Sequence, residues 1–136
     1  MAVDFPASPT LNQTYTDSGR TWRWNGTGWQ LSADAWRIIP QSAKTGAYTL
    51  EATDTGYHIS ITTGGVTVPS GVFAVGDTVM VYNNSASSQT ITQGASVTLR
   101  QAGTTTTGNR ALASYGVCAI LCVASNTFVI SGSGLS

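Results

Sequence analysis

The sequence predicts an all-β protein in which a small N-terminal Trp-rich hairpin module is followed by an antiparallel β-sandwich or barrel. Thr, Ser, Gly and Val dominate the chain, and these residues favour strands and turns over helices. Turn signals built from Gly, Asn, Asp and Ser recur about every 8 to 12 residues, which is the spacing of short antiparallel strands. With 136 residues the chain can bury a core without a metal or a disulfide.

The first predicted domain, residues 1–36, consists of an extended arm and a hairpin module. Two prolines, Pro6 and Pro9, hold the arm extended. Strands are predicted over Thr14–Thr16 and Arg20–Trp24, and the turn Asp17-Ser18-Gly19 separates them. A second turn, Asn25-Gly26-Thr27-Gly28, separates Trp24 from Trp29, where the next strand begins.

Aromatic side chains are the candidate partner contacts of this module. Because side chains alternate along a strand, Trp22 and Trp24 should share one face, and the hairpin should bring Trp29 back to meet them. Such indoles can form the core of a small sheet, or they can form a platform for a sugar or a protein partner. The candidate contacts are Phe5, Trp22, Trp24, Trp29 and Trp36.

The second predicted domain, residues 37–136, is the β-sandwich domain. Its predicted strands cover Ala47–Glu51, Tyr57–Thr62, Thr78–Tyr82, Gln89–Thr92, Ser96–Arg100, Tyr115–Val123 and Thr127–Ile130, with Val66–Pro69 as a short edge piece and a flexible tail from Ser131. The apolar run Ala111–Ala124 favours a fully buried strand. The hydroxyl-rich stretch Thr104–Thr107 predicts a loop that is either a contact loop or a floppy one.

Charge is scarce, since only 9% of the residues are charged and the net charge is zero. We therefore expect neither nucleic acid nor an anionic membrane as a partner. Lys44 is the only lysine and Glu51 the only glutamate, whereas five arginines are present. Interfaces show this bias, so we expect a protein that works inside an assembly; the alternative is a surface that relies on hydroxyls and amides, as in many secreted β-proteins.

No set of residues predicts catalysis, a cofactor or a metal site. His58 is the sole histidine and lies in mid-strand, while Asp17, Asp54 and Asp77 each belong to a glycine-containing turn. The two cysteines, Cys118 and Cys122, would be about 13 Å apart along a strand, beyond the roughly 7 Å that a disulfide allows, so they should be reduced core residues. We expect a non-enzymatic protein.

Two sets of motifs in the chain carry a resemblance to known proteins. The residues Phe5-Pro6-Ala7-Ser8-Pro9-Thr10, Gln13-Thr14-Tyr15 and Thr21-Trp22-Arg23-Trp24-Asn25-Gly26-Thr27-Gly28-Trp29 resemble a short module of tail-fibre and other virion proteins of tailed bacteriophages. The rest is similar to a β-module of phage structural proteins, through Tyr48-Thr49-Leu50, Asp54-Thr55-Gly56, Val66-Thr67-Val68-Pro69, Val75-Gly76-Asp77, Val97-Thr98-Leu99-Arg100 and Asn126-Thr127-Phe128-Val129-Ile130.

The resemblance implies a virion structural protein and a homo-oligomer, with a trimer as one option. We expect a capsid decoration or cement protein on the outer surface of the capsid, bound to the major capsid protein, because the chain has no long fibre shaft. The alternative is a tail-fibre or tail-tip adhesin that binds host glycan. Residues 1–9 lack the basic and apolar regions of a signal peptide, so synthesis in the host cytoplasm is expected.

Overall fold

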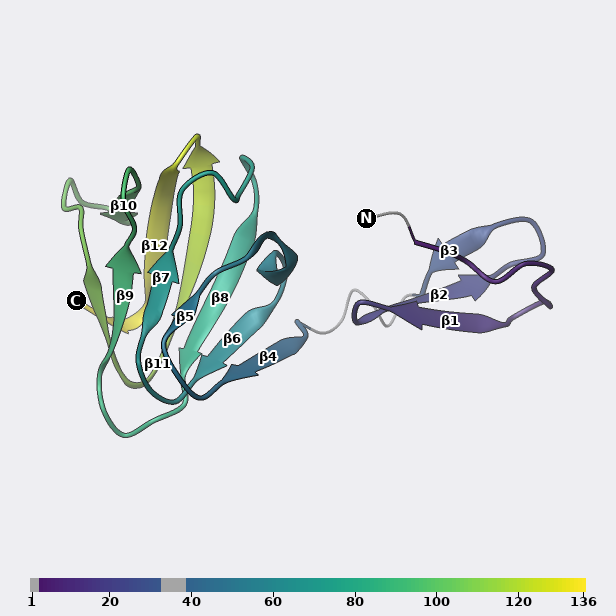
Figure 1. The fold of residues 1–136 in the computed structure, drawn as a ribbon, viewed down its shortest axis with the longest axis horizontal. Helices are drawn as coiled ribbons and strands as arrows, with labels where there is room; N and C mark the ends of the chain where they lie inside the picture. The colour runs from purple at the N-terminus through teal and green to yellow at the C-terminus, as the bar shows by residue number, and fades with distance from the viewer. Residues whose placement is uncertain (1–2, 33–38) are drawn as a thin grey trace. The chain divides into compact units, whose positions relative to one another are not determined.

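The computed structural model describes residues 3–32 and 39–136, and it confirms the all-β fold class. The chain divides into two compact units, residues 1–40 and 41–136 (Figure 1). The boundary predicted between residues 36 and 37 lies outside the described residues. Each unit has its own sheet, one with three strands and one with nine.

The first unit is an antiparallel sheet of three strands, β1 (Thr14–Asp17), β2 (Arg20–Trp24) and β3 (Trp29–Leu31). Ser18 and Gly19 join β1 to β2 with φ values of 49° and 76°. Two successive positive φ values define the turn whose twist matches a two-residue hairpin, which explains why Gly follows Ser here. The turn predicted from Asp17-Ser18-Gly19 is confirmed.

The second unit contains nine strands in one curved sheet. They are β4 (Gln41–Lys44), β5 (Tyr48–Thr49), β6 (His58–Ile61), β7 (Val66–Val68), β8 (Thr78–Asn83), β9 (Gln89–Gln93), β10 (Thr98–Gln101), β11 (Arg110–Ala124) and β12 (Thr127–Leu135). A short 3₁₀ turn, η2 (Ala52–Asp54), follows β5. The strand β12 includes most of the tail predicted to be flexible from Ser131, so that prediction was wrong.

Strands of this unit alternate between two parallel stacks. β4, β6 and β8 pair in parallel, as do β5, β7 and β9, so the chain crosses from one stack to the other at each connection. Both stacks end on β11, which is antiparallel to β9 through Arg110–Leu112 and to β8 through Val117–Leu121. Figure 1 shows the stacks in colours from blue (β4) through teal (β7, β8) to green (β9), beside the yellow-green and yellow strands β11 and β12 of the C-terminal hairpin.

This arrangement corrects two sequence-based predictions. The barrel-like sheet is mixed rather than antiparallel, because strands that wind in the same sense around one core pair in parallel with the strand of the next turn. The segment Val66–Pro69 is not an edge piece, because β7 lies between β5 and β9.

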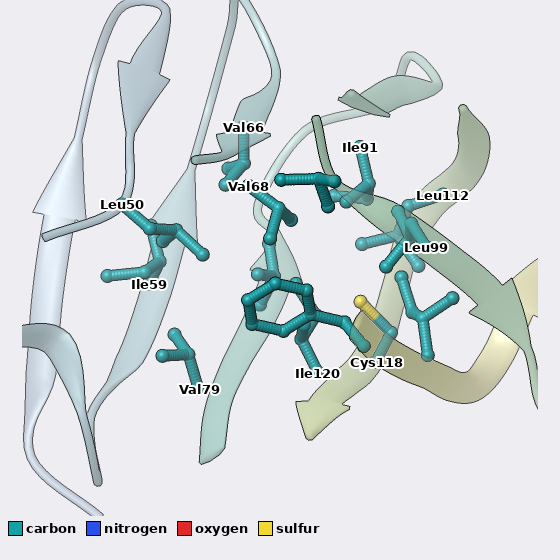
Figure 2. Close-up of a cluster of buried hydrophobic side chains, with 14 of the residues drawn as sticks. Leu50, Ile59, Val66, Val68, Val79, Ile91, Leu99, Leu112, Cys118 and Ile120 are labelled. Carbon is teal, nitrogen blue, oxygen red and sulfur yellow. The ribbon is translucent and has the colours of Figure 1, made fainter. Parts of the chain in front are cut away.

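The core fills the space enclosed by the curved sheet. Figure 2 shows its side chains converging from both stacks and from β11. The buried apolar residues are Leu50, Ile59, Ile61, Val66, Val68, Val79, Val81, Ile91, Val97, Leu99, Leu112, Cys118, Ile120, Cys122, Phe128 and Ile130. Both cysteines are free thiols in this core, as predicted.

Asn83 fixes the point where β11 turns from one stack to the other. A bulge interrupts the pairing of β11 between Leu112 and Val117. The fully buried Asn83 amide donates to the carbonyl oxygens of Leu112 at 3.1 Å and Ala113 at 2.9 Å, beside the bulge. The Ser88 hydroxyl also donates to the Leu112 carbonyl, at 3.3 Å, so side chains from β8 and from the segment before β9 both serve the backbone at the bend.

Candidate functional site

The candidate site predicted from the sequence is the aromatic face of the first unit. Strand register places Trp22 opposite both Tyr15 and Leu31, and Trp24 opposite Trp29. All of these side chains point to the same face, because directly paired residues share a face and residues alternate along β2. The rings of Trp24 and Trp29 lie 5.7 Å apart with an interplanar angle of 59°.

The turn after β2 holds Trp24 and Trp29 opposite each other. The side-chain oxygen of Asn25 accepts the backbone N–H groups of Thr27 at 2.9 Å and Gly28 at 2.8 Å. Gly26 has a φ of 98°, a value that side chains strongly disfavour. These two requirements explain the Asn-Gly sequence between the two indoles.

Phe5 of the N-terminal arm completes the cluster. Its ring stacks on Trp29 with 5.2 Å between centroids and an interplanar angle of 10°. It also meets Tyr15 and Trp22 edge-on, at 5.7 Å and 5.4 Å. Pairs of this kind contribute about 0.5–1.5 kcal/mol each beyond the area that they bury. The arm therefore packs on the aromatic face and covers one side of the Trp29 ring.

The structure thus brings together four of the five predicted contact residues, Phe5, Trp22, Trp24 and Trp29. Trp36 lies outside the described residues. Tyr15 belongs to the same cluster, and its position opposite Trp22 across a two-residue turn is the signal that could have found it. None of the five clustered rings is fully buried, so the cluster is the core of this unit and part of its surface at once.

Acidic side chains of the second unit serve its turns. Oδ2 of Asp54 accepts the N–H of Glu51 at 2.8 Å, and Oδ2 of Asp77 accepts the N–H of Ala74 at 2.9 Å. His58 Nε2 lies 3.1 Å from Gln41 Oε1 on the neighbouring strand. In the described ranges, no group of three or more His, Cys, Asp or Glu side chains could hold a metal ion.

Arg110 is the unusual charge of the second unit. Its relative exposure is 9%, and Nε and Nη2 are buried without a hydrogen-bond partner among the described residues. These two nitrogens form the edge that binds a carboxylate in two-point contacts elsewhere in proteins. Burying them unpaired costs free energy, so Arg110 is a local weakness of the core.

Burial also sets the chemistry of the two thiols. It raises the pKa of Cys118 to about 12, against the weaker effect of a backbone hydrogen bond from Val81. Burial is the main cause that raises the pKa of Cys122, and the nearby charge of Asp77 adds to it. Both groups are therefore protonated and unreactive near neutral pH.

No helix in the part of the chain that the structure describes is long and apolar enough to cross a membrane. Comparisons with protein-family models, with curated proteins and with solved structures find no significant match to this chain.

Proposed function

We propose that this chain is a non-enzymatic structural protein of a tailed-phage virion, and specifically a capsid decoration or cement protein that stabilises the head shell. The proposal rests on the motifs that resemble virion proteins and on one structural observation. A small unit with partly buried aromatic rings is joined to a larger unit that has a complete core of its own.

The division of the chain suits a protein whose function is attachment. The second unit is stabilised by its own buried residues, so the aromatic cluster of the first unit is not needed to fold it. Trp and Tyr are the side chains that most often dominate binding energy at protein interfaces. The exposed parts of Trp22, Trp24 and Trp29 therefore supply contact area for shell subunits.

Binding of this kind would depend little on charge. The chain has six basic and six acidic residues and a net charge of zero. Attachment through apolar and hydroxyl-rich surface is barely screened by salt, whereas attachment through charge weakens as ionic strength rises. We expect the protein to stay on particles at salt concentrations that release electrostatically bound proteins.

The alternative, a tail adhesin that stacks host sugars on its indoles, has less support. Phe5 covers one side of Trp29, and the planes of Trp24 and Trp29 are inclined by 59°. A sugar-binding platform needs freely accessible ring faces, so the aromatic face fits a shaped protein surface better.

Particles with and without the protein test the proposal. Phage lacking the gene should lose DNA at lower temperature than complete particles, and adding back the purified chain should restore the difference. An antibody should label the head shell. Equal DNA retention, or label on the tail together with blocked adsorption by free protein, would contradict the cement function.

Variants of the aromatic face refine the test. Trp24→Ala should bind stripped heads more weakly than the wild-type chain, because it removes a partly exposed ring of the cluster. Arg23→Ala is the matched control, because Arg23 is the exposed neighbour on the opposite face of β2. Equal loss of binding in both variants would speak against the aromatic face as the attachment surface.

A further inference from the structure

Arg110 points into the apolar core of the second unit. It pairs with Ile91 of β9, and directly paired residues share a face of the sheet. Ile91 is fully buried, and so is Leu112, the next inward residue of β11. Figure 2 shows Ile91, Leu99 and Leu112 gathered at one end of the core. The charged side chain of Arg110 therefore extends into apolar surroundings.

Among the described residues, no acidic side chain reaches Nε or Nη2 of Arg110. The acidic residues of the second unit are Glu51, Asp54 and Asp77. Asp54 and Asp77 each turn a carboxylate oxygen to a backbone N–H of their own turn. A buried charge without a counter-ion is strongly unfavourable. A ligand that brings both an acceptor and a negative charge would remove this cost.

Gln93 places a second donor on the same side of the sheet. It follows Ile91 by two residues on β9, so its side chain also faces inward. Its Oε1 accepts the N–H of Leu99 at 2.9 Å and the N–H of Gly108 at 3.0 Å. The carbonyl end of the amide is thereby engaged, and the amide nitrogen is left to donate. Gly108 lies two residues before Arg110, so this donor lies close to the start of β11.

The chemistry of these donors selects a carboxylate. Nε and Nη2 of a guanidinium present two parallel N–H groups, which match the two oxygens of one carboxylate. A water molecule would accept a hydrogen bond but leave the charge without a counter-ion, and a dianionic phosphate would leave an excess negative charge in the core. The neighbours Ile91 and Leu112 favour an apolar group behind the carboxylate.

We propose that Arg110 and Gln93 bind a short aliphatic carboxylate at this end of the core. Access is from the loop 102–109, which directly precedes Arg110 and is largely exposed. Arg110 itself keeps 9% of its surface exposed, which limits the ligand to a small one. The carboxylate accepts from Nε and Nη2, and the Gln93 amide donates to one of the same oxygens. The proposal does not depend on a role in a virion, because it rests on the second unit alone.

Scanning calorimetry of the full chain, with acetate as the probe, tests the proposal. About 0.1 M sodium acetate should raise the unfolding temperature of the second unit by roughly 4 °C or more over the same concentration of sodium chloride. Arg110→Met should abolish this difference. Arg100→Met is the matched control and should keep it, because Arg100 is an exposed arginine of β10. Equal unfolding temperatures of the wild-type chain in the two salts would overturn the proposal, and so would an acetate effect that Arg110→Met retains.

An NMR titration of the wild-type chain with acetate keeps the test valid if Arg110→Met fails to fold. The Nε–H signal of Arg110 should shift and reach a plateau as acetate is added, whereas the Nε–H signal of the exposed Arg100 should stay in place. Arg110→Lys keeps the charge but loses the planar pair of donors, so it should weaken acetate binding by about tenfold or more. An Arg110 signal that acetate leaves unmoved would assign the two nitrogens to water and overturn the proposal.

Discussion

The hydroxyl of Tyr48 donates a 2.9 Å hydrogen bond to Oδ2 of Asp54, the same oxygen that accepts the N–H of Glu51. Tyr48 belongs to the edge strand β5, and Asp54 ends the 3₁₀ turn that follows it. Asp54 is only 4% exposed. The hydrogen bond therefore links the edge strand β5 to the 3₁₀ turn that follows it. This link matters because β5 has only two residues with which to pair with its neighbour.

Replacing Tyr48 by Phe should lower the free energy of unfolding by about 1–2 kcal/mol, because a buried carboxylate oxygen loses a donor. The pKa of Tyr48 lies well above its ordinary value of about 10, through burial first and then through the bond to Asp54. A raised folded-state pKa contributes stability below pH 10 that is lost as pH rises further.

Denaturant unfolding at neutral pH and above pH 10 measures both effects. The wild-type chain should lose stability over the alkaline range, and Tyr48→Phe should lose less. Tyr115→Phe is the control, because Tyr115 is 61% exposed and its loss should change neither the neutral value nor the alkaline slope. An unchanged slope in Tyr48→Phe would show that another group causes it.

Gly132→Ala should destabilise the protein by about 2 kcal/mol or more, measured by thermal unfolding. Gly132 pairs with Cys118, and a Cβ at this position would overlap the backbone of Val117 and Cys118. Gly46→Ala is the matched control, because no atom lies within 4 Å of its Cβ position. A difference near zero between the two variants would mean that β11 and β12 can separate locally at little cost.

Arg110→Met should raise the free energy of unfolding by about 1–2 kcal/mol, since it replaces buried unpaired nitrogens by an apolar chain of similar length. Arg100→Met, on the exposed side of β10, should change it by less than about 0.5 kcal/mol. Chemical denaturation of both variants gives the comparison. Destabilisation by Arg110→Met would show that the guanidinium is satisfied in solution.

Phe5→Ala should lower the free energy of unfolding of the first unit by about 2 kcal/mol. The unfolding midpoint that tryptophan fluorescence reports should fall accordingly. All four tryptophans lie within residues 22–36, so this signal reports the first unit. Far-UV circular dichroism comes mostly from the nine-stranded sheet and should change less. Arg23→Ala should leave the fluorescence midpoint in place; if it matched Phe5→Ala, the stack on Trp29 would not be the cause.

Local features of the fold could be predicted from the sequence, but strand direction could not. The two hairpin turns of the first unit could be predicted from Asn25-Gly26 and Asp17-Ser18-Gly19, because the positive φ angles of these turns favour such residues. Alternation in Thr78–Tyr82 shows which side chains face the core, but it does not show which strand lies alongside. The pairing of β8 with β6 in parallel depends on how a whole connection winds around the core.

The candidate site follows the same division. Trp22, Trp24 and Trp29 could be placed together because they lie on adjacent strands of one hairpin. The position of Phe5 on Trp29 depends on the path of an arm without strand pairing of its own, which alternation cannot trace. The exposed side of β11 was missed because apolar residues occupy both faces of Val117–Val123, so alternation does not mark the outward face.

The second unit is built from repeated pairs of strands that wind around one core. Each pair, such as β6 with β7, adds one strand to each parallel stack, and β11 pairs with the last strand of both stacks. Inserting one more turn after β5 would lengthen the body by about 4.8 Å per strand spacing and leave the pairing of β11 with β8 and β9 intact. The design can therefore vary in length by whole turns while the C-terminal hairpin stays a constant end piece.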